Sequence, residues 1–177
     1  DVEDAGFDVM FLGRSLEIQK GRGTFGSGAL RFWGELFMPT KDDVSRMEFR
    51  SILDDAEFKV MPGMTMRASG AFDLEGPIKD LLLRGNIEIS KLEYWKNLEL
   101  KIENFLPKKG KTLTVPKFVS SQTISVDVHA EAKDSILFQS DQLEALFSAS
   151  VDFRGSTDSL GMVGTLTPTR GQVEYRD

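Results

Sequence analysis

The chain has 177 residues, of which 40% are hydrophobic and 28% are charged. This balance argues against disorder, and the length fits one domain that can bury a sizeable core. The net charge of -6 argues against nucleic-acid binding, which needs a basic patch, and the absence of cysteine excludes disulfides and thiolate metal sites.

Apolar and polar residues alternate with a period of two in many segments. In chain order, these segments are 30–32, 57–60, 86–90, 98–103, 124–132 and 173–175. Such alternation indicates strands with one buried and one solvated face, as in antiparallel sheets. With weaker candidates included we expect roughly a dozen strands, separated by clusters of Gly, Pro, Asn, Asp and Ser.

Helical patterning is confined to two short segments. Residues 42–47 have Asp42 as a candidate cap, and residues 142–147 contain the run Leu-Glu-Ala-Leu-Phe. We expect loops or 3₁₀ turns at both places. The sequence therefore predicts an all-β fold.

A short motif occurs three times, at residues 28–34, 70–76 and 149–155. Each copy has two small residues, then an apolar, a charged and an apolar residue, any residue, and Gly. In the last two copies a second Gly follows nine positions later, at Gly85 and Gly164, and begins another alternating stretch. A Gly that closes a strand suits a bulge or a bend.

Repetition of this kind is typical of elongated sheets in which neighbouring units bury the core together. We therefore expect residues 1–177 to be one continuous β-rich segment cut from a larger repetitive protein.

Residues 21–26 fit the pattern G-x-G-x-x-G of dinucleotide-binding proteins. That pattern binds phosphate when a helix follows it, and here a strand pattern follows. We interpret residues 21–26 as a flexible β-turn and predict no cofactor.

Candidate catalytic groups are few. His129 is the one histidine and lies at an outward-facing step of an alternating strand, so it is interpreted as a solvated surface residue. The acidic pairs 42–43 and 54–55 and the basic segment 108–111 are interpreted as solvated turns. Because no nucleophile, base or metal cluster is visible, the sequence predicts no enzyme and no bound metal.

One face of the predicted strands is consistently apolar. Its members, assigned by periodicity, are Leu30, Phe32, Phe72, Leu74, Ile87, Ile89, Leu98, Leu100, Ile102, Ile124, Val126, Val128, Val151, Phe153 and Leu166. They fit either the closed core of a β-sandwich or a groove along a curved sheet that is open on one side. On the residues alone the sandwich is favoured, and its function would be structural or adhesin-like binding of proteins or glycans.

Several segments resemble the C-terminal region of the TamB family, within the AsmA-like superfamily of bridge-type lipid transfer proteins. They are residues 85–100, the basic loop 107–111, the alternating strand 124–132, residues 136–141, residues 149–155 and residues 164–173, which have the pattern G-x-L-x-x-x-x-G-x-V. The resemblance extends from about Leu12 to the end of the chain.

This resemblance implies an elongated, taco-like structure, mostly a single curved sheet, that encloses a hydrophobic groove lined by the apolar residues named above. It implies a periplasmic protein anchored in the inner membrane outside this segment, with a partner of the TamA or BamA type reached through other parts of the protein. The implied task is to conduct phospholipid or fatty acyl chains, to assist outer-membrane protein assembly, or both. An apolar trough suits acyl chains, because each exposed CH₂ group costs about 0.8 kcal/mol.

Overall fold

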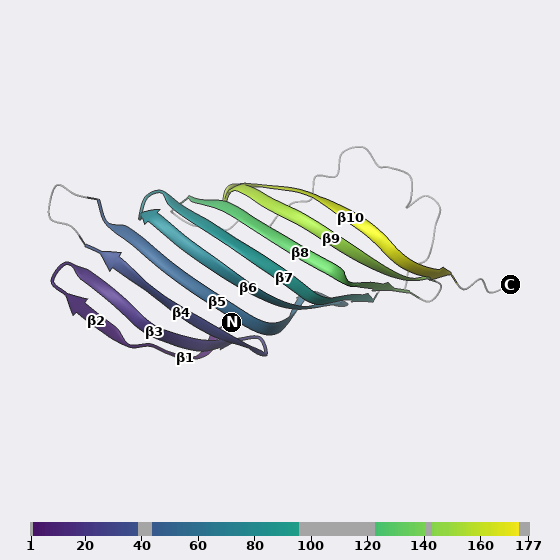
Figure 1. Cartoon of the computed structure of the whole chain (residues 1–177), viewed down its shortest axis with the longest axis horizontal. Helices are drawn as coiled ribbons and strands as arrows, with labels where there is room; N and C mark the ends of the chain where they lie inside the picture. The colour runs from purple at the N-terminus through teal and green to yellow at the C-terminus, as the bar shows by residue number, and fades with distance from the viewer. Residues whose placement is uncertain (1, 39–43, 96–122, 141–142, 174–177) are drawn as a thin grey trace.

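The computed structural model describes residues 2–38, 44–95, 123–140 and 143–173 (Figure 1). These residues form ten strands and contain no helix. The strands are β1 (Val2–Gly6), β2 (Val9–Leu12), β3 (Ser15–Phe25), β4 (Gly28–Phe37), β5 (Arg46–Met61), β6 (Met64–Pro77), β7 (Leu81–Trp95), β8 (Ile124–Gln139), β9 (Leu143–Ser156) and β10 (Ser159–Val173). The predicted all-β fold is confirmed.

All ten strands belong to one open sheet. Its order is β1-β3-β4-β5-β6-β7-β8-β9-β10, and β2 pairs with β3 on the same edge as β1. Within the described ranges no second sheet or helix packs on either face, since each strand contacts chiefly its hydrogen-bonded neighbours. The β-sandwich alternative is therefore wrong for this part of the chain, whereas lengthwise folding into a taco stays a prediction.

One junction in the sheet is parallel. Strand β7 pairs with β8 in parallel, from Leu81 opposite Ile124 to Glu88 opposite Glu131, while the other neighbouring pairs are antiparallel. Parallel neighbours need a crossover connection of about a dozen residues or more. Residues 96–122, which contain the predicted strand 98–103 and the basic segment 108–111, lie outside the described ranges.

The parallel junction separates two equivalent units of three strands, β5-β6-β7 and β8-β9-β10. Equivalent residues are 79 positions apart: β6 begins at Met64 and β9 at Leu143, and the two strands end at Pro77 and Ser156. A meander of three strands ends in the direction in which it began. Two such units placed side by side in one orientation must therefore meet in a parallel pair. The motif copies 70–76 and 149–155 are the part of this repeat that is visible in the sequence.

The units repeat a polar contact at a bulge in their first strand. Asp55 and Asp134 have positive φ angles of 50° and 48°. The backbone N–H of Asp55 donates to Ser69 Oγ at 3.0 Å, and that of Asp134 donates to Ser148 Oγ at 2.8 Å. An Asp tolerates the left-handed conformation better than most residues, which suits it to a bulge.

A second pair of equivalent contacts lies in the third strand of each unit. The hydroxyl of Ser90 donates to the carbonyl of Arg67 at 3.2 Å, and the hydroxyl of Thr169 donates to the carbonyl of Leu146 at 3.1 Å. The ladder register shifts at both places. Both units therefore carry an extra residue at matching positions, which bends a strand and increases its twist.

Four local predictions need correction, the last of them in part. Residues 143–147 begin strand β9 rather than a turn, because their side chains take opposite faces of the sheet. The acidic pair 54–55 lies at the bulge of β5 and not in a loop. Residues 21–25 are part of β3, so the turn is reduced to Gly26 and Ser27. Residues 42–43 lie outside the described ranges, and Arg46 and Met47 are in β5.

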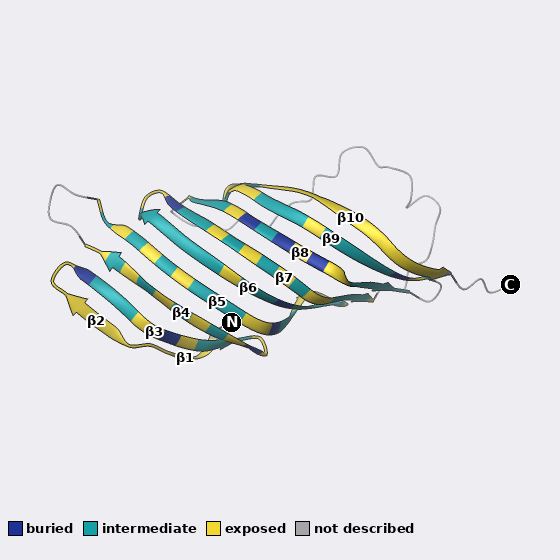
Figure 2. Cartoon of the chain, in the orientation of Figure 1, coloured by how far each residue is buried: buried dark blue, intermediate teal, exposed yellow. Residues whose placement is uncertain are grey.

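The buried apolar side chains are mostly small, and three of the seven lie on β8. They are Ala56, Ala68, Leu81, Val128, Ala130, Ala132 and Ala145. No large side chain of the described residues is fully buried. Figure 2 shows buried segments along β8 and exposed strands at β2 and β10. The large apolar side chains therefore lie half-exposed on a sheet that has no covering layer among the described residues.

The bulge contact of the second unit can be tested at Ser148. Its hydroxyl accepts the N–H of Asp134 and donates to the Asp134 carboxylate at 2.9 Å. We expect Ser148→Ala to lower the free energy of unfolding in urea by about 1 kcal/mol. Ser150→Ala, at an exposed position on the same strand, is the control. Equal midpoints for the two variants would contradict the role given to the bulge contact.

Candidate functional site: an apolar face along one side of the sheet

The strand register aligns apolar side chains of neighbouring strands on one face of the sheet. Residues directly opposite each other point to the same side. One row across the sheet consists of Leu30, Leu53, Gly70, Ile87, Ala130, Val151 and Gly164. The next consists of Phe32, Ser51, Phe72, Gly85, Val128, Phe153 and Met162. We call this side the apolar face.

Twelve of the fifteen residues assigned by periodicity lie on the apolar face. Besides those in the two rows, they include Leu74 and Val126, which lie on either side of Leu83 in a third row. Ile89 is opposite Ala68, Ile124 is opposite Leu81, and Leu166 is opposite Ala149. The remaining three, Leu98, Leu100 and Ile102, lie outside the described ranges. The structure thus places the described residues on one side, while their role toward lipid stays a prediction.

Several residues of the apolar face were missed by the periodicity. They are Phe49, Leu53, Phe58, Met66, Leu83, Leu92, Tyr94, Ile136, Phe138, Phe147 and Met162. Many of them follow a bulge, which shifts the alternation by one residue. The aromatic pairs Tyr94–Phe138, with ring centroids 5.7 Å apart, and Phe32–Phe49, with centroids 5.6 Å apart, each join two neighbouring strands on this face.

Glycines make room for phenylalanine rings that lie across the sheet. A Cβ atom placed on Gly85 would meet the ring of Phe72 at 2.6 Å, and one placed on Gly21 would collide with the ring of Phe32. On the far side of Gly21, the ring of Phe7 lies 6.4 Å from that of Phe32. The rings therefore lie over the backbone of the neighbouring glycines, and the apolar face continues across these positions.

The apolar face is hollowed beside the bulge of β5. A hollow of about 320 Å³ is lined by Phe25, Leu30, Ser51, Leu53, Phe58, Met66, Ala68, Ser69, Gly70, Phe72 and Ile87. The rings of Phe25 and Phe58 meet edge to face there, with centroids 5.5 Å apart. Nearly all of the lining is carbon, so the hollow offers an apolar ligand contact without directional hydrogen bonds.

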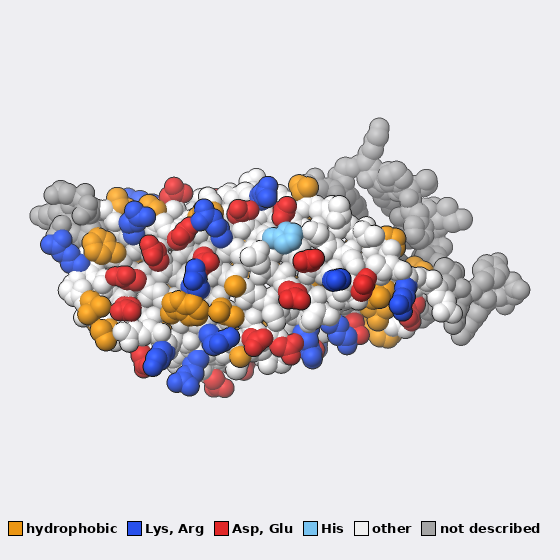
Figure 3. Space-filling view, viewed as in Figure 1, with side chains coloured by type: hydrophobic (Ala, Val, Ile, Leu, Met, Phe, Trp, Pro, Cys, Tyr) orange, Lys and Arg blue, Asp and Glu red, His pale blue; other side chains and the backbone are white. Residues whose placement is uncertain are grey.

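The opposite side of the sheet, the charged face, carries charges of alternating sign. Arg50, Asp73, Arg84, Asp127 and Arg154 lie opposite one another in five successive strands. Figure 3 shows acidic and basic side chains intermingled on this side, with the histidine among them. Opposite charges in directly facing positions favour this register.

The charged face also contains four glutamates in one row. Glu17, Glu35, Glu48 and Glu75 face one another across β3 to β6. Like charges in facing positions oppose pairing, and Arg84 offsets one of them by an ion pair with Glu75. The row lines a polar hollow of about 700 Å³.

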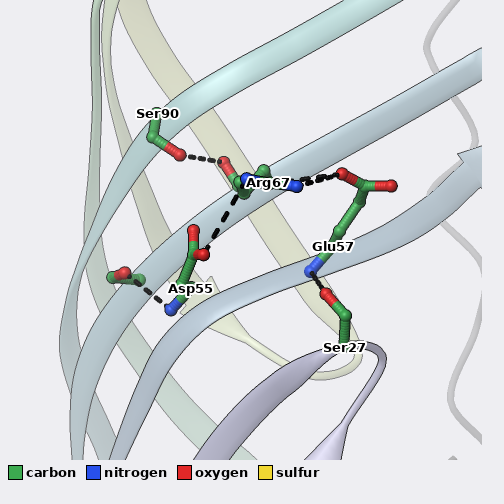
Figure 4. Close-up of polar contacts among 6 residues, drawn as sticks. Ser27, Asp55, Glu57, Arg67 and Ser90 are labelled. Carbon is green, nitrogen blue, oxygen red and sulfur yellow. Dashed lines mark hydrogen bonds and ion pairs between the residues drawn. The ribbon is translucent and has the colours of Figure 1, made fainter.

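An ion-pair cluster on the charged face joins β5 to β6 near the β5 bulge (Figure 4). Arg67 Nη2 lies 2.9 Å from Glu57 Oε2, and its Nη1 lies 3.8 Å from Asp55 Oδ2. These carboxylates raise the pKa of Arg67, and the largest cause is the hydrogen bond that Arg67 donates to Glu57. The backbone N–H of Glu57 donates to Ser27 Oγ at 3.2 Å, which attaches the β3–β4 turn to β5.

His129 occupies the position that Arg50 occupies in the other unit. Arg50 Nε lies 2.5 Å from Asp73 Oδ1, and His129 Nδ1 lies 2.8 Å from Asp152 Oδ1; each residue of one pair is 79 positions from its equivalent. The hydrogen bond from His129 lowers the pKa of Asp152 despite partial desolvation, and Arg154 lowers it further. His129 was predicted to be a solvated surface residue; it lies half-exposed on the charged face, and its contact with Asp152 on β9 assigns it to cross-strand pairing. No group of metal-binding side chains occurs among the described residues.

The fold and the two faces define an all-β protein built as one open, amphipathic sheet. A family model described as the TamB C-terminal domain matches residues 20–177. The chain therefore belongs to the TamB family, as the resemblance predicted. No curated protein and no solved structure matches the chain.

TamB-family proteins are non-enzymatic, periplasmic and anchored in the inner membrane. They take part in outer-membrane protein assembly and associate with an outer-membrane protein of the TamA type. The described residues contain no helix long and apolar enough to cross a membrane.

The contact between Gly85 and Phe72 makes a prediction for stability. We expect Gly85→Ala to lower the free energy of unfolding by about 1–3 kcal/mol, because the added methyl group forces the Phe72 ring and nearby backbone to move. Gly171→Ala is the control, since its Cβ would meet atoms only at ordinary contact distances of 3.8–3.9 Å. Urea unfolding should show the control unchanged or slightly stabilised.

The lowered pKa of Asp152 makes a prediction for pH dependence. The ionised carboxylate contributes its stabilisation fully above the pKa of an unfolded Asp, about 3.9, and loses it as the pH falls through the lowered folded value. Asp152→Asn should therefore be less stable than the parent at pH 7, with the difference vanishing in strong acid. Thermal unfolding across this range, with Asp80→Asn as control, measures it. A difference that persists unchanged at pH 2 would refute the pairing as its cause.

Proposed function

We propose that the apolar face shelters the acyl chains of phospholipid and so forms part of a path for lipid through the periplasm. The observation that supports this proposal is the continuity of apolar side chains across the sheet, with no covering layer among the described residues. An uncovered apolar surface of this extent is typical of a binding surface.

The dimensions of the face suit a long, flexible ligand. Nine strands lie side by side from β1 to β10. Neighbouring strands are about 4.8 Å apart, so the eight intervals give the face a width of roughly 38 Å across the strands. Each CH₂ group moved from water onto this face gains up to about 0.8 kcal/mol. Because carbon contacts have no preferred direction, a chain can be displaced along the face without breaking hydrogen bonds.

The charged face supports the same function by keeping the opposite side in water. Its ion pairs are half-exposed, such as Arg50 with Asp73, whose side chains are 58% and 44% accessible. Pairs of this kind add little stability, but they keep that face polar. A sheet with one wet and one apolar side can stay in an aqueous compartment while it holds lipid.

Assistance to outer-membrane protein assembly is the second task proposed for the same face. Strands of outer-membrane barrels have apolar side chains on alternate positions and need shelter before insertion. The apolar face of β4 to β9 offers a complementary surface. Lipid and barrel strands would then compete for it.

The lipid proposal can be tested on the edge strand, where a substitution disturbs no packed core. Met162 is 57% exposed on the apolar face, and Val163 is 76% exposed on the charged face. We expect Met162→Asp to reduce bound phospholipid several-fold after incubation with lipid micelles, and Val163→Asp to leave it unchanged. Native mass spectrometry with lipid extraction measures the bound amount.

A central pair of variants repeats the test within the sheet. Phe72→Asp should abolish lipid binding, while Ala71→Asp, its exposed neighbour on the charged face, should keep it. Circular dichroism checks that each variant retains its β-structure. A lipid-free parent protein, or equal lipid binding by both members of the edge pair, would overturn the proposal.

A further inference from the structure

The hollow beside the bulge of β5 lies within the sheet. Its lining residues come from β3 to β7, and each of these strands has a paired neighbour on both sides. These strands therefore have no free edge at which a further strand can pair. The hollow can bind a ligand only through the side chains that surround it.

The hollow lies over positions with small side chains. Ala68 of β6 belongs to its lining and lies opposite Ala56 of β5, and these two residues are 2% and 0% exposed. Gly70, two residues further along β6 on the same face, also belongs to the lining. Because these residues have little or no side chain, the apolar face is lowered here between the larger side chains around them.

The second unit has large side chains at the equivalent positions. The repeat of 79 positions maps Ala68 onto Phe147 of β9. Phe147 lies opposite Ile136 of β8, as Ala68 lies opposite Ala56 of β5. The fold thus accepts an aromatic ring where the first unit has Ala68. The small residues are therefore a property of the first unit and not a requirement of the fold.

Three phenylalanines from three strands surround the hollow. They are Phe25 of β3, Phe58 of β5 and Phe72 of β6. Phe25 and Phe58 hold each other by their edge-to-face contact. The ring of Phe72 lies so close to Gly70 and Gly85 that a Cβ atom on either would be 3.1 Å or 2.6 Å from it. These contacts fix the walls, so the shape of the hollow is present before a ligand binds.

The lining determines the chemistry of the ligand. None of the lining residues is charged, and the polar ones are Ser51 and Ser69. Ser69 Oγ already accepts the N–H of Asp55 at 3.0 Å. A phosphate, a carboxylate or a peptide group would leave water here without gaining a matching set of partners. A hydrocarbon chain has no such groups to satisfy, and the volume of about 320 Å³ is near the lower end of ligand pockets, roughly 300–1,000 Å³.

We propose that this hollow, the acyl site, holds one acyl chain of a phospholipid, with the methyl end of the chain against Ala68 and the headgroup outside. The inference rests on the proposed lipid path and adds a fixed binding site to it. Because the acyl site opens onto the apolar face, the rest of the lipid can lie along the neighbouring strands. A chain in the acyl site has contacts on several sides and therefore leaves more slowly than one on the flat part of the face. The first unit retains a lipid where the second unit only conducts it.

Photo-cross-linking tests the position and direction of the chain. The probe is a phosphatidylcholine with a diazirine group near the methyl end of one acyl chain, and mass spectrometry identifies the labelled residues. We expect labelling to saturate at one adduct per protein and to be concentrated on Phe58 and Met66. A phosphatidylcholine with the diazirine group in its headgroup should label these two residues several-fold less.

Two substitutions that copy the second unit separate the acyl site from the rest of the apolar face. Ala68→Phe introduces the ring of Phe147 and fills the hollow without adding polarity, so methyl-end labelling of Phe58 and Met66 should fall several-fold. Ser51→Ala copies Ala130 and leaves the hollow open, so labelling should be retained. Circular dichroism and urea unfolding check that both variants keep the fold.

The outcomes distinguish the acyl site from the lipid path. Labelling of the parent protein spread evenly over the apolar face, or unchanged labelling of a folded Ala68→Phe variant, would overturn the acyl site and leave the lipid path standing. A parent protein that binds no phospholipid would overturn both. If Ala68→Phe does not fold, the distribution of adducts on the parent protein decides alone.

Discussion

The cross-strand register is the constraint on which the rest of the structure depends. Side chains alternate between faces, so a slip of one residue would move a whole strand's apolar set into water. The sheet nevertheless contains extra residues in β5, β7, β8 and β10. It tolerates them because Asp55, Ser90 and Asp134 absorb the slip at bulges, each with a hydrogen bond to a neighbouring strand. The apolar face therefore continues on both sides of each bulge.

The same bulges explain which parts of the site the sequence reveals. Phe72, Val128 and Phe153 lie in stretches where strict alternation holds, so periodicity places them on the correct face. Leu92 follows the bulge at Ser90 and Ile136 follows the one at Asp134, and both were missed. A bulge depends on contacts with the neighbouring strand, such as that of Asp134 with Ser148, and these contacts cannot be read from one segment alone. The family resemblance was recognisable because the glycine positions recur.

The three-strand unit explains the one parallel junction in the sheet. Alternation along β7 and β8 resembles that of antiparallel strands, because no other described residues form a layer over either face of the sheet. Nothing in those residues distinguishes the two orientations. The orientation follows instead from the odd number of strands in a unit, and the corresponding residues of β6 and β9 make the unit visible. When units are added in the same orientation, their apolar side chains all lie on the same side of the sheet, so the apolar face becomes longer.

Comparison of the two units separates what the fold requires from what has changed. Both keep Asp at the bulge, Ser as its acceptor and Gly at the ends of the second strand, where Gly76 and Gly155 have φ angles of 125° and 132°. Both keep an aspartate in the cross-strand pair, but its partner is Arg50 in one and His129 in the other. The fold therefore requires the bulge and the turn, and it accepts either cation beside the aspartate.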